Sequence, residues 1–260
     1  MPYLSRIRIN PLRAQSQKLL ASPHAAHGAV QGGVPGPQGG ERLLWRLDAD
    51  NPHRPHLYVL SRSRPDWTHL VESAGWPDAD GEHVAVRSYE PLLKGLAAGQ
   101  EYAFRLTANP VQRTKQPPHP TPNQARKLAA PVEGSSPRGF RIALRTAHTQ
   151  LAWFLDRTEQ WGFSVSASRT DPAAPGLAEP SPGPEPAQPR DTPREVRITA
   201  RHRHSFAKKG SRRVTFYSAT FEGHLRVTDA DTFTATLLTG VGPAKAYGCG
   251  LLTLAPLRSG

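Results

Sequence analysis

Residues 3–20 read YLSRIRINPLRAQSQKLL, and this stretch decides the fold predicted for the first half of the chain. Arginine and isoleucine alternate over residues 6–9, a period of two that predicts a β-strand. An Asn-Pro pair follows, and the helix-favouring residues 13–20 come next. We expect that helix to fray into residues 24–30. The chain is therefore predicted to begin with a strand and a helix.

The rest of the first half extends this pattern. Strand-like runs occupy residues 42–47 and 57–61. A short helix is predicted to open at Pro65-Asp66 and to carry Trp67, Leu70 and Val71. After a polar loop, residues 101–108 alternate large apolar side chains with more polar ones, which predicts a strand. The order β-α-β-β-α-β is that of the ferredoxin-like fold and of the RNA-recognition motif. Several other open α+β folds would give similar patterns.

The second half is predicted to repeat the scheme. Its expected strands are residues 140–145, 163–166, 196–200, 214–221 and 251–255. A turn at Glu222-Gly223 is predicted to separate 214–221 from a further strand at 225–228. One helix is expected around residues 148–155, and a last helix is capped by Asp229 or Thr228 and ends at Gly240. The predicted fold class is α+β, with two tandem ferredoxin-like, RRM-like βαββαβ domains.

Glycine and proline content places the boundaries between these units. We predict an N-terminal domain over 1–112, a linker over 113–138 rich in Pro, Gln, Lys and Thr, and a C-terminal domain over 139–260. Residues 168–193 contain eight prolines in 26 residues and no aromatic side chain. Such a segment cannot bury enough surface to offset its ordering entropy, so a disordered insertion is expected there.

Charge and cysteine content narrow the class of protein. The 260 residues include 33 Lys and Arg against 21 Asp and Glu, a net charge of +12, which favours an anionic partner such as nucleic acid or a membrane surface. No stretch is apolar enough to span a membrane, and charged residues near Met1 argue against a secretory leader, so a cytoplasmic protein is expected. The single cysteine, Cys249, excludes an internal disulfide and a multi-cysteine zinc site.

Two segments are candidate RNA-binding surfaces. Residues 194–213 carry eight Arg or Lys and one acid, a band suited to successive phosphates, although a solvated sheet edge would also be charged. The glycine-rich run 240–250 could present backbone N–H groups to a phosphate, or it could be a turn that packs two elements closely; composition favours neither. The predicted RNA-binding residues are Arg197, Arg201, Arg203, Lys208, Lys209, Arg212, Arg213, Gly242, Lys245 and Gly248.

His24 and His27 lie three residues apart beside the glycine-rich residues 31–40. Their spacing would suit two metal ligands, but no carboxylate or cysteine nearby completes a set, so no metal and no cofactor are expected. Either imidazole could transfer a proton near neutral pH. A surface histidine without a role is the alternative for each of them, as it is for His202 and His204.

Six stretches of the chain read YLSRIRI (3–9), SPHAAH (22–27), ERLLWRL (41–47), FRLTANP (104–110), FEG (221–223) and GVGPAKAYGCGLLTLAP (240–256). Together they resemble the CasE endoribonuclease family of type I-E CRISPR systems. The last is the most specific, and the insertion 168–193 lies outside the resemblance. The resemblance spans nearly the whole chain.

This resemblance implies a function for the chain. Members bind the stem-loop of CRISPR repeat RNA, cut it at the 3′ base of the stem without a metal, and keep the product as a subunit of Cascade. His27 matches the catalytic histidine of the family, and His24 stands where relatives often carry a tyrosine. The basic residues that relatives place after this histidine are absent, so the source of transition-state stabilisation is open. The implied partners are repeat RNA and other Cascade subunits, with no membrane. A non-catalytic RNA-binding or assembly module and a ribosomal or RNA-chaperone-like protein are the alternatives.

Overall fold

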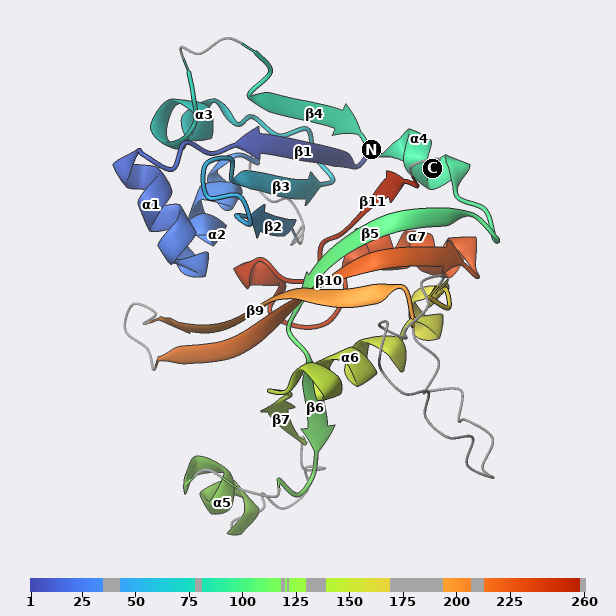
Figure 1. Cartoon of the computed structure of the whole chain (residues 1–260). Helices are drawn as coiled ribbons and strands as arrows, with labels where there is room; N and C mark the ends of the chain where they lie inside the picture. Colours follow the sequence, from blue (N-terminus) through green and yellow to red (C-terminus); the bar gives the residue numbers. More distant parts are fainter. Residues whose placement is uncertain are drawn as a thin grey trace, which may run out of the picture.

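The computed structural model describes residues 1–34, 43–77, 81–117, 120, 122–129, 139–168, 194–206 and 213–257. Its first half contains a sheet of antiparallel strands in the order β2-β3-β1-β4, with helices against one face (Figure 1). The elements of this unit are β1 (Tyr3–Arg8), α1 (Ala14–Ala21), α2 (Pro23–Gly32), β2 (Leu44–Asp48), β3 (His56–Ser61), α3 (Thr68–Ala74) and β4 (Val84–Ser88).

A second sheet has the strand order β11-β5-β10-β8. Numbered within its own unit, this is the order 4-1-3-2, which the first sheet also has when it is followed from β4 to β2. The elements are β5 (Glu101–Ala108), α6 (Ala147–Leu155), η1 (Glu159–Trp161), β8 (Phe163–Val165), β10 (Val214–Val227), α7 (Ala230–Thr239), η2 (Lys245–Tyr247) and β11 (Leu252–Pro256). The prediction of two tandem ferredoxin-like units is confirmed, and α4 (Glu90–Gly95) connects them.

Strand β5 belongs to the second sheet, so the prediction that it closes the first half is wrong. It pairs with β10 on one edge and β11 on the other, which makes it a central strand. The first sheet is closed instead by β4, which pairs with β1 and lies in the segment predicted to be a polar loop. The division of the chain at residue 112 therefore does not coincide with the division into sheets.

A long antiparallel hairpin extends the second sheet. Strand β9 (Val196–Phe206) pairs along β10, and β10 runs without interruption through the turn predicted at Glu222-Gly223. The glycine there serves close packing instead, because a Cβ on Gly223 would lie 1.9 Å from the carbonyl oxygen of Glu195. A shift of register between Thr220 and Phe221 marks a bulge in the pairing.

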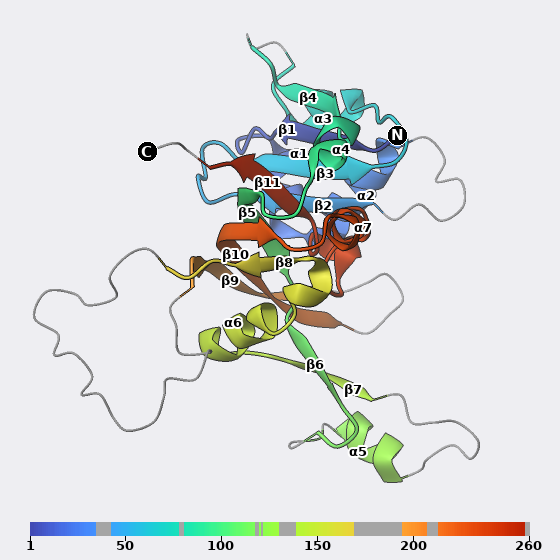
Figure 2. The same cartoon turned by 90° about the vertical axis from the view of Figure 1, so that its right-hand side faces the viewer.

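An arm projects from the second unit on the side away from the first sheet (Figures 1 and 2). It consists of β6 (Val111–Thr114), α5 (Pro122–Ala129) and β7 (Phe140–Ala143), and β6 and β7 form a separate two-stranded sheet. The predicted linker 113–138 thus contains a helix, and the strand expected at 140–145 pairs with β6 and not with the main sheet. Of the predicted insertion, residues 169–193 lie outside the described part of the chain.

The two units share a core. Leu44 and Leu60 of the first sheet pack in the same cluster as Phe104, Phe154 and Phe221 of the second unit. A separate cluster, which includes Ile7, Trp45 and Val59, lies between the first sheet and its helices. The shared cluster fixes the position of the first sheet, and hence of the helices packed on it, relative to the hairpin of β9 and β10.

Candidate functional site

Helix α2 carries both candidate catalytic histidines. The sequence prediction treated residues 24–30 as the frayed end of the first helix, and this is wrong, because a new helix begins at Pro23. Ser22 is its N-cap, and the Ser22 hydroxyl accepts a hydrogen bond from the backbone N–H of Ala25 at 3.3 Å. Proline is well suited to the first helical position, since its missing N–H would have no partner there.

The spacing of the two histidines places them on one face of α2. Residues three apart are neighbours on a helix surface, so His24 and His27 lie one turn from each other. The side chain of His24 is exposed, and that of His27 is partly buried. Two imidazoles on one helix face could share the work of moving two protons at a single substrate.

His24 meets the end of the basic hairpin through a cluster of aromatic side chains. Its ring is parallel to that of Phe206, with the ring centroids 6.3 Å apart. Phe206 contacts the ring of Tyr247 edge-on at 5.0 Å, and Tyr247 stacks on Phe216 at 5.7 Å. We call His24, Phe206, Phe216 and Tyr247 the junction cluster. It joins α2, both strands of the hairpin and the glycine-rich loop, and the sequence prediction missed it.

The hairpin presents different side chains on its two faces. His202, His204 and Phe206 alternate with Arg201 and Arg203 along β9, so the two sets lie on opposite faces. The histidine face is the one that includes Phe206 of the junction cluster, whereas Arg201 reaches α6 on the other side of the sheet. The predicted RNA-binding arginines and the link to α2 therefore occupy opposite faces of the same strand.

His204 is held within the sheet face. Its Nε2 atom lies 2.8 Å from the hydroxyl of Ser218, and its ring stacks on Phe216 at 4.5 Å. Burial, and then the nearby His202, lower the pKa of His204 below its usual value. The ring is therefore neutral at neutral pH, and its role at this position is to support the packing of Phe216.

The predicted RNA-binding side chains of the hairpin are spread along its length. Arg197 is 79% exposed, with one terminal nitrogen 3.6 Å from the Glu222 carboxylate. Arg203 and Arg213 are exposed, and Arg201 donates to the side-chain oxygen of Gln150 at 2.9 Å. Lys208, Lys209 and Arg212 lie outside the described residues.

The glycine-rich loop packs against the first unit, where η2 contacts α2 and β2. Gly248 is buried at a φ of +81°, and a Cβ there would lie 2.9 Å from the Trp45 ring. Close packing by itself thus requires glycine at position 248, and the prediction that this residue binds RNA remains a prediction.

The two other predicted contacts in this loop are less buried. Gly242 has a φ of +68° and is partly exposed. Lys245 donates from its Nζ atom to the carbonyl oxygen of Thr239 at 2.6 Å, which ties the loop to the end of α7. Both residues lie on the loop that carries Tyr247 of the junction cluster.

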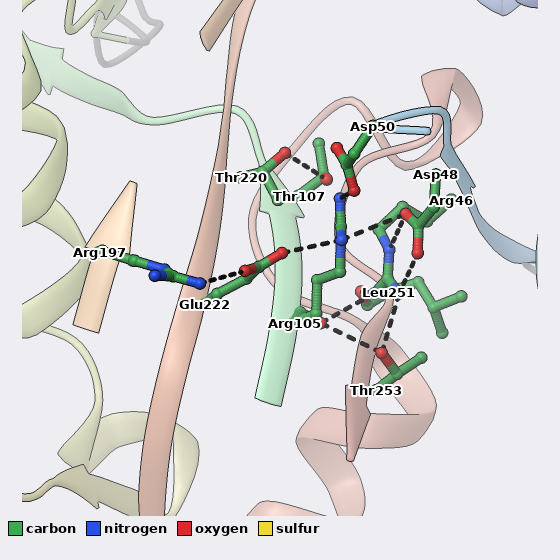
Figure 3. Close-up of polar contacts among 10 residues, drawn as sticks. All are labelled: Arg46, Asp48, Asp50, Arg105, Thr107, Arg197, Thr220, Glu222, Leu251 and Thr253. Atoms are coloured by element: carbon green, nitrogen blue, oxygen red, sulfur yellow. Dashed lines mark hydrogen bonds and ion pairs between the residues drawn. The ribbon is translucent and has the colours of Figure 1, made fainter. Parts of the chain in front are cut away.

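A network of charged residues also crosses between the units (Figure 3). Arg46 of β2 is only 2% exposed, and its guanidinium donates to both Asp48 oxygens at 2.7 and 2.9 Å. The same group donates to the carbonyl oxygens of Arg105 and Leu251 at 2.8 and 3.1 Å. Arg105 in turn pairs with Glu222 at 2.8 Å. The buried arginine therefore satisfies acceptors from β2, β5 and the approach to β11.

Neither a metal cluster nor a membrane span is found in the described part of the chain. Over those residues, no group of three or more His, Cys, Asp and Glu side chains is placed to hold a metal ion. Among the described helices, none is long and apolar enough to cross a membrane.

The fold and the candidate site together define a class of protein. Two ferredoxin-like sheets, with a basic hairpin meeting a histidine-bearing helix, form a tandem RRM-like protein equipped for nucleic acid. A family model described as CRISPR associated protein matches residues 2–256, and the chain belongs to that family.

Individual relatives agree with this assignment. The chain is 32% identical to the CRISPR-associated endoribonuclease Cse3 of Thermus thermophilus over 257 residues, which is 98% of this chain and 100% of the relative. It is 26% identical to the CRISPR system Cascade subunit CasE of Escherichia coli over 218 residues, or 82% and 89% of the two chains. A solved structure of Thermus thermophilus Cse3 bound to an RNA representing a pre-cleavage complex is similar with a TM-score of 0.67, 27% identity and coverage of 98% and 99%.

Proposed function

We propose that this protein is a metal-independent endoribonuclease that binds the stem-loop of CRISPR repeat RNA and cleaves it at the 3′ base of the stem. The observation that carries the proposal is the stacking of His24 on Phe206, at the end of the basic strand β9. This contact holds a pair of proton-transferring groups at the end of a strand whose opposite face carries arginines suited to phosphates, although α2 and β9 are far apart in sequence. The relative named as an endoribonuclease and the RNA-bound structure of Cse3 support the same function.

The proposed reaction uses a nucleophile supplied by the RNA. The ribose 2′-oxygen attacks the adjacent phosphorus and loses its proton, while the bond from phosphorus to the 5′-oxygen breaks and that oxygen gains a proton. The products are a 2′,3′-cyclic phosphate and a 5′-hydroxyl. His27 acts as general base or general acid, a role worth typically about 10²–10⁴-fold in rate. His24, one turn away, is placed to serve the other proton.

Positioning of the reacting atoms supplies a further part of the rate enhancement. The 2′-oxygen must lie in line with the leaving 5′-oxygen, and a rigid site that holds this geometry lowers the entropic barrier. The junction cluster links α2 to the hairpin, and the buried Arg46 ties β2 of the first sheet to β5 and to the approach to β11. An RNA bound on the hairpin therefore meets α2 in a fixed place. Arginine side chains of the hairpin, together with Lys245, contact its phosphates.

The product stays bound, and the protein acts as a subunit of Cascade. The relative named as a Cascade subunit supports this part of the proposal. The cytoplasm is the proposed location, where a lone buried thiol such as Cys249 stays reduced.

A cleavage assay on a synthetic repeat hairpin tests this function. The wild-type protein should cut a labelled stem-loop in EDTA and leave a cyclic phosphate. The same stem-loop with a 2′-deoxy nucleotide at the scissile position should bind to the protein without being cut. Strict dependence on a divalent metal, or cleavage of the deoxy substrate, would exclude the 2′-oxygen route. Binding without any cleavage would instead favour a non-catalytic RNA-binding or assembly module.

A further inference from the structure

Strand β4 is one edge of the first sheet, and no strand of the described residues pairs with its outer side. The other edge of this sheet, β2, contacts η2 of the second unit. β4 lies on the side of the sheet away from the second unit (Figures 1 and 2). An open strand edge is a template for pairing with another chain. The proposed function gives this edge no role.

The register of β4 against β1 determines which backbone groups point outward. The backbone N–H of Arg8 donates to the carbonyl oxygen of His83 at 2.9 Å, and that of Tyr89 donates to the carbonyl oxygen of Pro2 at 2.8 Å. Residues of an antiparallel pair alternate between positions that bond to the neighbouring strand and positions that do not. The residues whose backbone N–H and carbonyl groups point to the open edge are therefore Val84, Val86 and Ser88.

A groove of about 700 Å³ lies between β4 and α3. Its apolar lining includes Val84 and Val86 of β4, Val71 of α3, and Trp67. Val84 is directly opposite Ile7 in the register, so both side chains are on the face that the helices cover. Ile7 is fully buried, whereas Val84 and Val86 are only partly buried. The helices therefore leave an apolar strip along β4 incompletely covered.

Trp67 brings an unused hydrogen-bond donor to the same groove. Its side chain is 2% exposed, and its Nε1 atom has no hydrogen-bond partner among the described residues. A Cβ on Gly33 would lie 2.1 Å from Cζ3 of Trp67, so the benzene edge of the indole faces the end of α2 and the N–H is on the opposite edge. Buried donors without an acceptor are rare, and each requires an explanation. A carbonyl oxygen of an extended chain in the groove would satisfy this one.

The rim of the groove is acidic, although the whole chain is basic. Asp66 and Glu72 line it together with a single cation, Arg64, and all three are exposed. The hydroxyl and the backbone N–H of Thr68 donate to the Asp66 carboxylate at 2.6 and 2.9 Å. These bonds lower the pKa of Asp66, so the carboxylate is ionised at neutral pH. Two carboxylates against one guanidinium disfavour a phosphate backbone and favour a basic side chain.

We propose that β4 and the groove beside it are a docking site for an extended segment of a partner protein, which adds to the first sheet as a further strand. The backbone of this segment pairs with the open edge of β4 and gives affinity, and alternate side chains give specificity. Apolar side chains of the segment enter the groove, and a Lys or Arg lies beside Asp66 and Glu72. The proposed function does not depend on this site, and neither His24 nor His27 lines it.

A yeast-displayed library of random ten-residue peptides tests the site. Peptides that bind the wild-type protein are selected, and their affinity is then measured on Val86→Pro. The N–H of Val86 points to the open edge, so proline removes it without removing a bond to β1. We expect selected peptides that alternate apolar residues and carry a Lys or Arg, and a loss of at least about tenfold on Val86→Pro. Val86→Thr keeps the N–H and the branched side chain and should bind within about threefold of wild type. Selection of no such peptides, or equal binding by wild type and Val86→Pro, would overturn the proposal.

Methylated peptides test strand pairing on the wild-type protein, so the result does not depend on how Val86→Pro folds. The best selected peptide is synthesised twice, with one or the other set of alternate backbone nitrogens methylated. A peptide that adds as a strand donates to β4 from one set only. Methylation of that set should abolish binding, and methylation of the other set should leave it within about threefold of the parent peptide. Equal effects of the two methylation patterns would contradict pairing with β4.

Charge variants and two further measurements test the kind of occupant. D66N/E72Q should weaken the selected peptide about two- to fivefold and should not affect its version with Gln in place of Lys or Arg. D156N/E159Q removes two exposed carboxylates from the second unit and should affect neither peptide. Self-association of the wild-type protein that Val86→Pro abolishes, measured by sedimentation, would assign the edge to a second copy of this chain. Weaker binding of repeat RNA by D66N/E72Q would assign it to RNA, and either result would overturn the proposal of a different protein partner.

Discussion

Replacement of Gly248 by alanine should destabilise the protein by a predictable amount. Gly248 has a φ of +81°, and its added Cβ would lie 2.9 Å from one atom of the Trp45 ring and 3.1 Å from another. A side chain at positive φ costs roughly 1–2 kcal/mol, and an extra methyl group in a packed core costs roughly 1–3 kcal/mol. Trp45 is 2% exposed and cannot easily move aside. The two costs together predict a loss of about 3 kcal/mol.

Urea and thermal unfolding measure this loss. A decrease of about 3 kcal/mol corresponds to a fall in Tm of roughly 6–12 °C for a chain of this size. Gly95→Ala is the matched control, because Gly95 lies at the end of α4 and an added Cβ meets nothing within 4 Å. That control should be neutral or stabilising by up to about 0.5 kcal/mol. Equal stability of the two variants would refute the packing argument.

The same variant separates packing from RNA contact at position 248. If glycine is required there only by Trp45, the folded fraction of Gly248→Ala should bind repeat RNA within about twofold of wild type. A loss of affinity with no loss of stability would instead support the prediction that the Gly248 backbone contacts RNA. Affinity is therefore measured well below the Tm of the variant, in the same buffer as the unfolding curves.

Three further predictions concern the site and its support. His27→Ala should reduce single-turnover cleavage by at least about 10²-fold and leave hairpin affinity, measured by filter binding, nearly unchanged; full activity would remove His27 from the mechanism. Arg46→Met should lower the free energy of unfolding by about 3 kcal/mol, because it removes the Arg46 donor from Asp48 and from the carbonyl oxygens of Arg105 and Leu251; a loss below about 1 kcal/mol in urea unfolding would contradict the bridging role. Because the pKa of His204 is lowered in the folded state, the unfolded chain binds its proton first, so stability is complete above about pH 6.5 and falls as the pH drops below it. His204→Gln should remove that part of the pH dependence, and an unchanged dependence would assign it to other groups.

Local signals in the sequence predicted the elements that depend on local structure. The alternation around Ile7 and Ile9 gave β1, and the last helix follows from Asp229 at its start and Gly240 at its end. Asp229 does accept a hydrogen bond from the backbone N–H of Thr232, at 2.8 Å. Caps and periodicity act over a few residues, so one sequence is sufficient to recognise them.

Sheet membership could not be predicted in the same way. Strand β5 was correctly expected as a strand, but its partners begin at residues 219 and 252, more than a hundred positions away. Gly223 indicated a turn because glycine usually permits one, whereas here the constraint is the approach of the Glu195 carbonyl oxygen. Strand pairings of this kind depend on which strand edges meet in the folded protein, and the composition of a segment does not indicate its partner.

The same difference between local and long-range features applies to the candidate site. The spacing of His24 and His27 made them candidates and the resemblance gave His27 its expected catalytic role, but the separate helix that carries them was not predicted. The junction cluster joins positions 24, 206, 216 and 247, and Arg46 reaches the carbonyl oxygen of Leu251. The sequence near these residues gave only two signals, an aromatic residue, Phe206, at the end of a cationic strand and an arginine, Arg46, within an apolar strand. Either pattern also occurs for many other reasons.

In the proposed function, the alternation of side chains along β9 lets one strand serve both RNA binding and the support of the histidines. Arg201 and Arg203 face α6 and the arm, and Phe206 faces α2 and stacks on His24. Because successive side chains of a strand point to opposite faces, the arginines and Phe206 do not compete for the same contacts. A phosphate held by an arginine of this strand is therefore at a fixed offset from the histidines, through a backbone that is itself paired with β10. In the proposed function, the hairpin is the rigid unit that positions the scissile bond, and α2 supplies the proton-transferring groups to it.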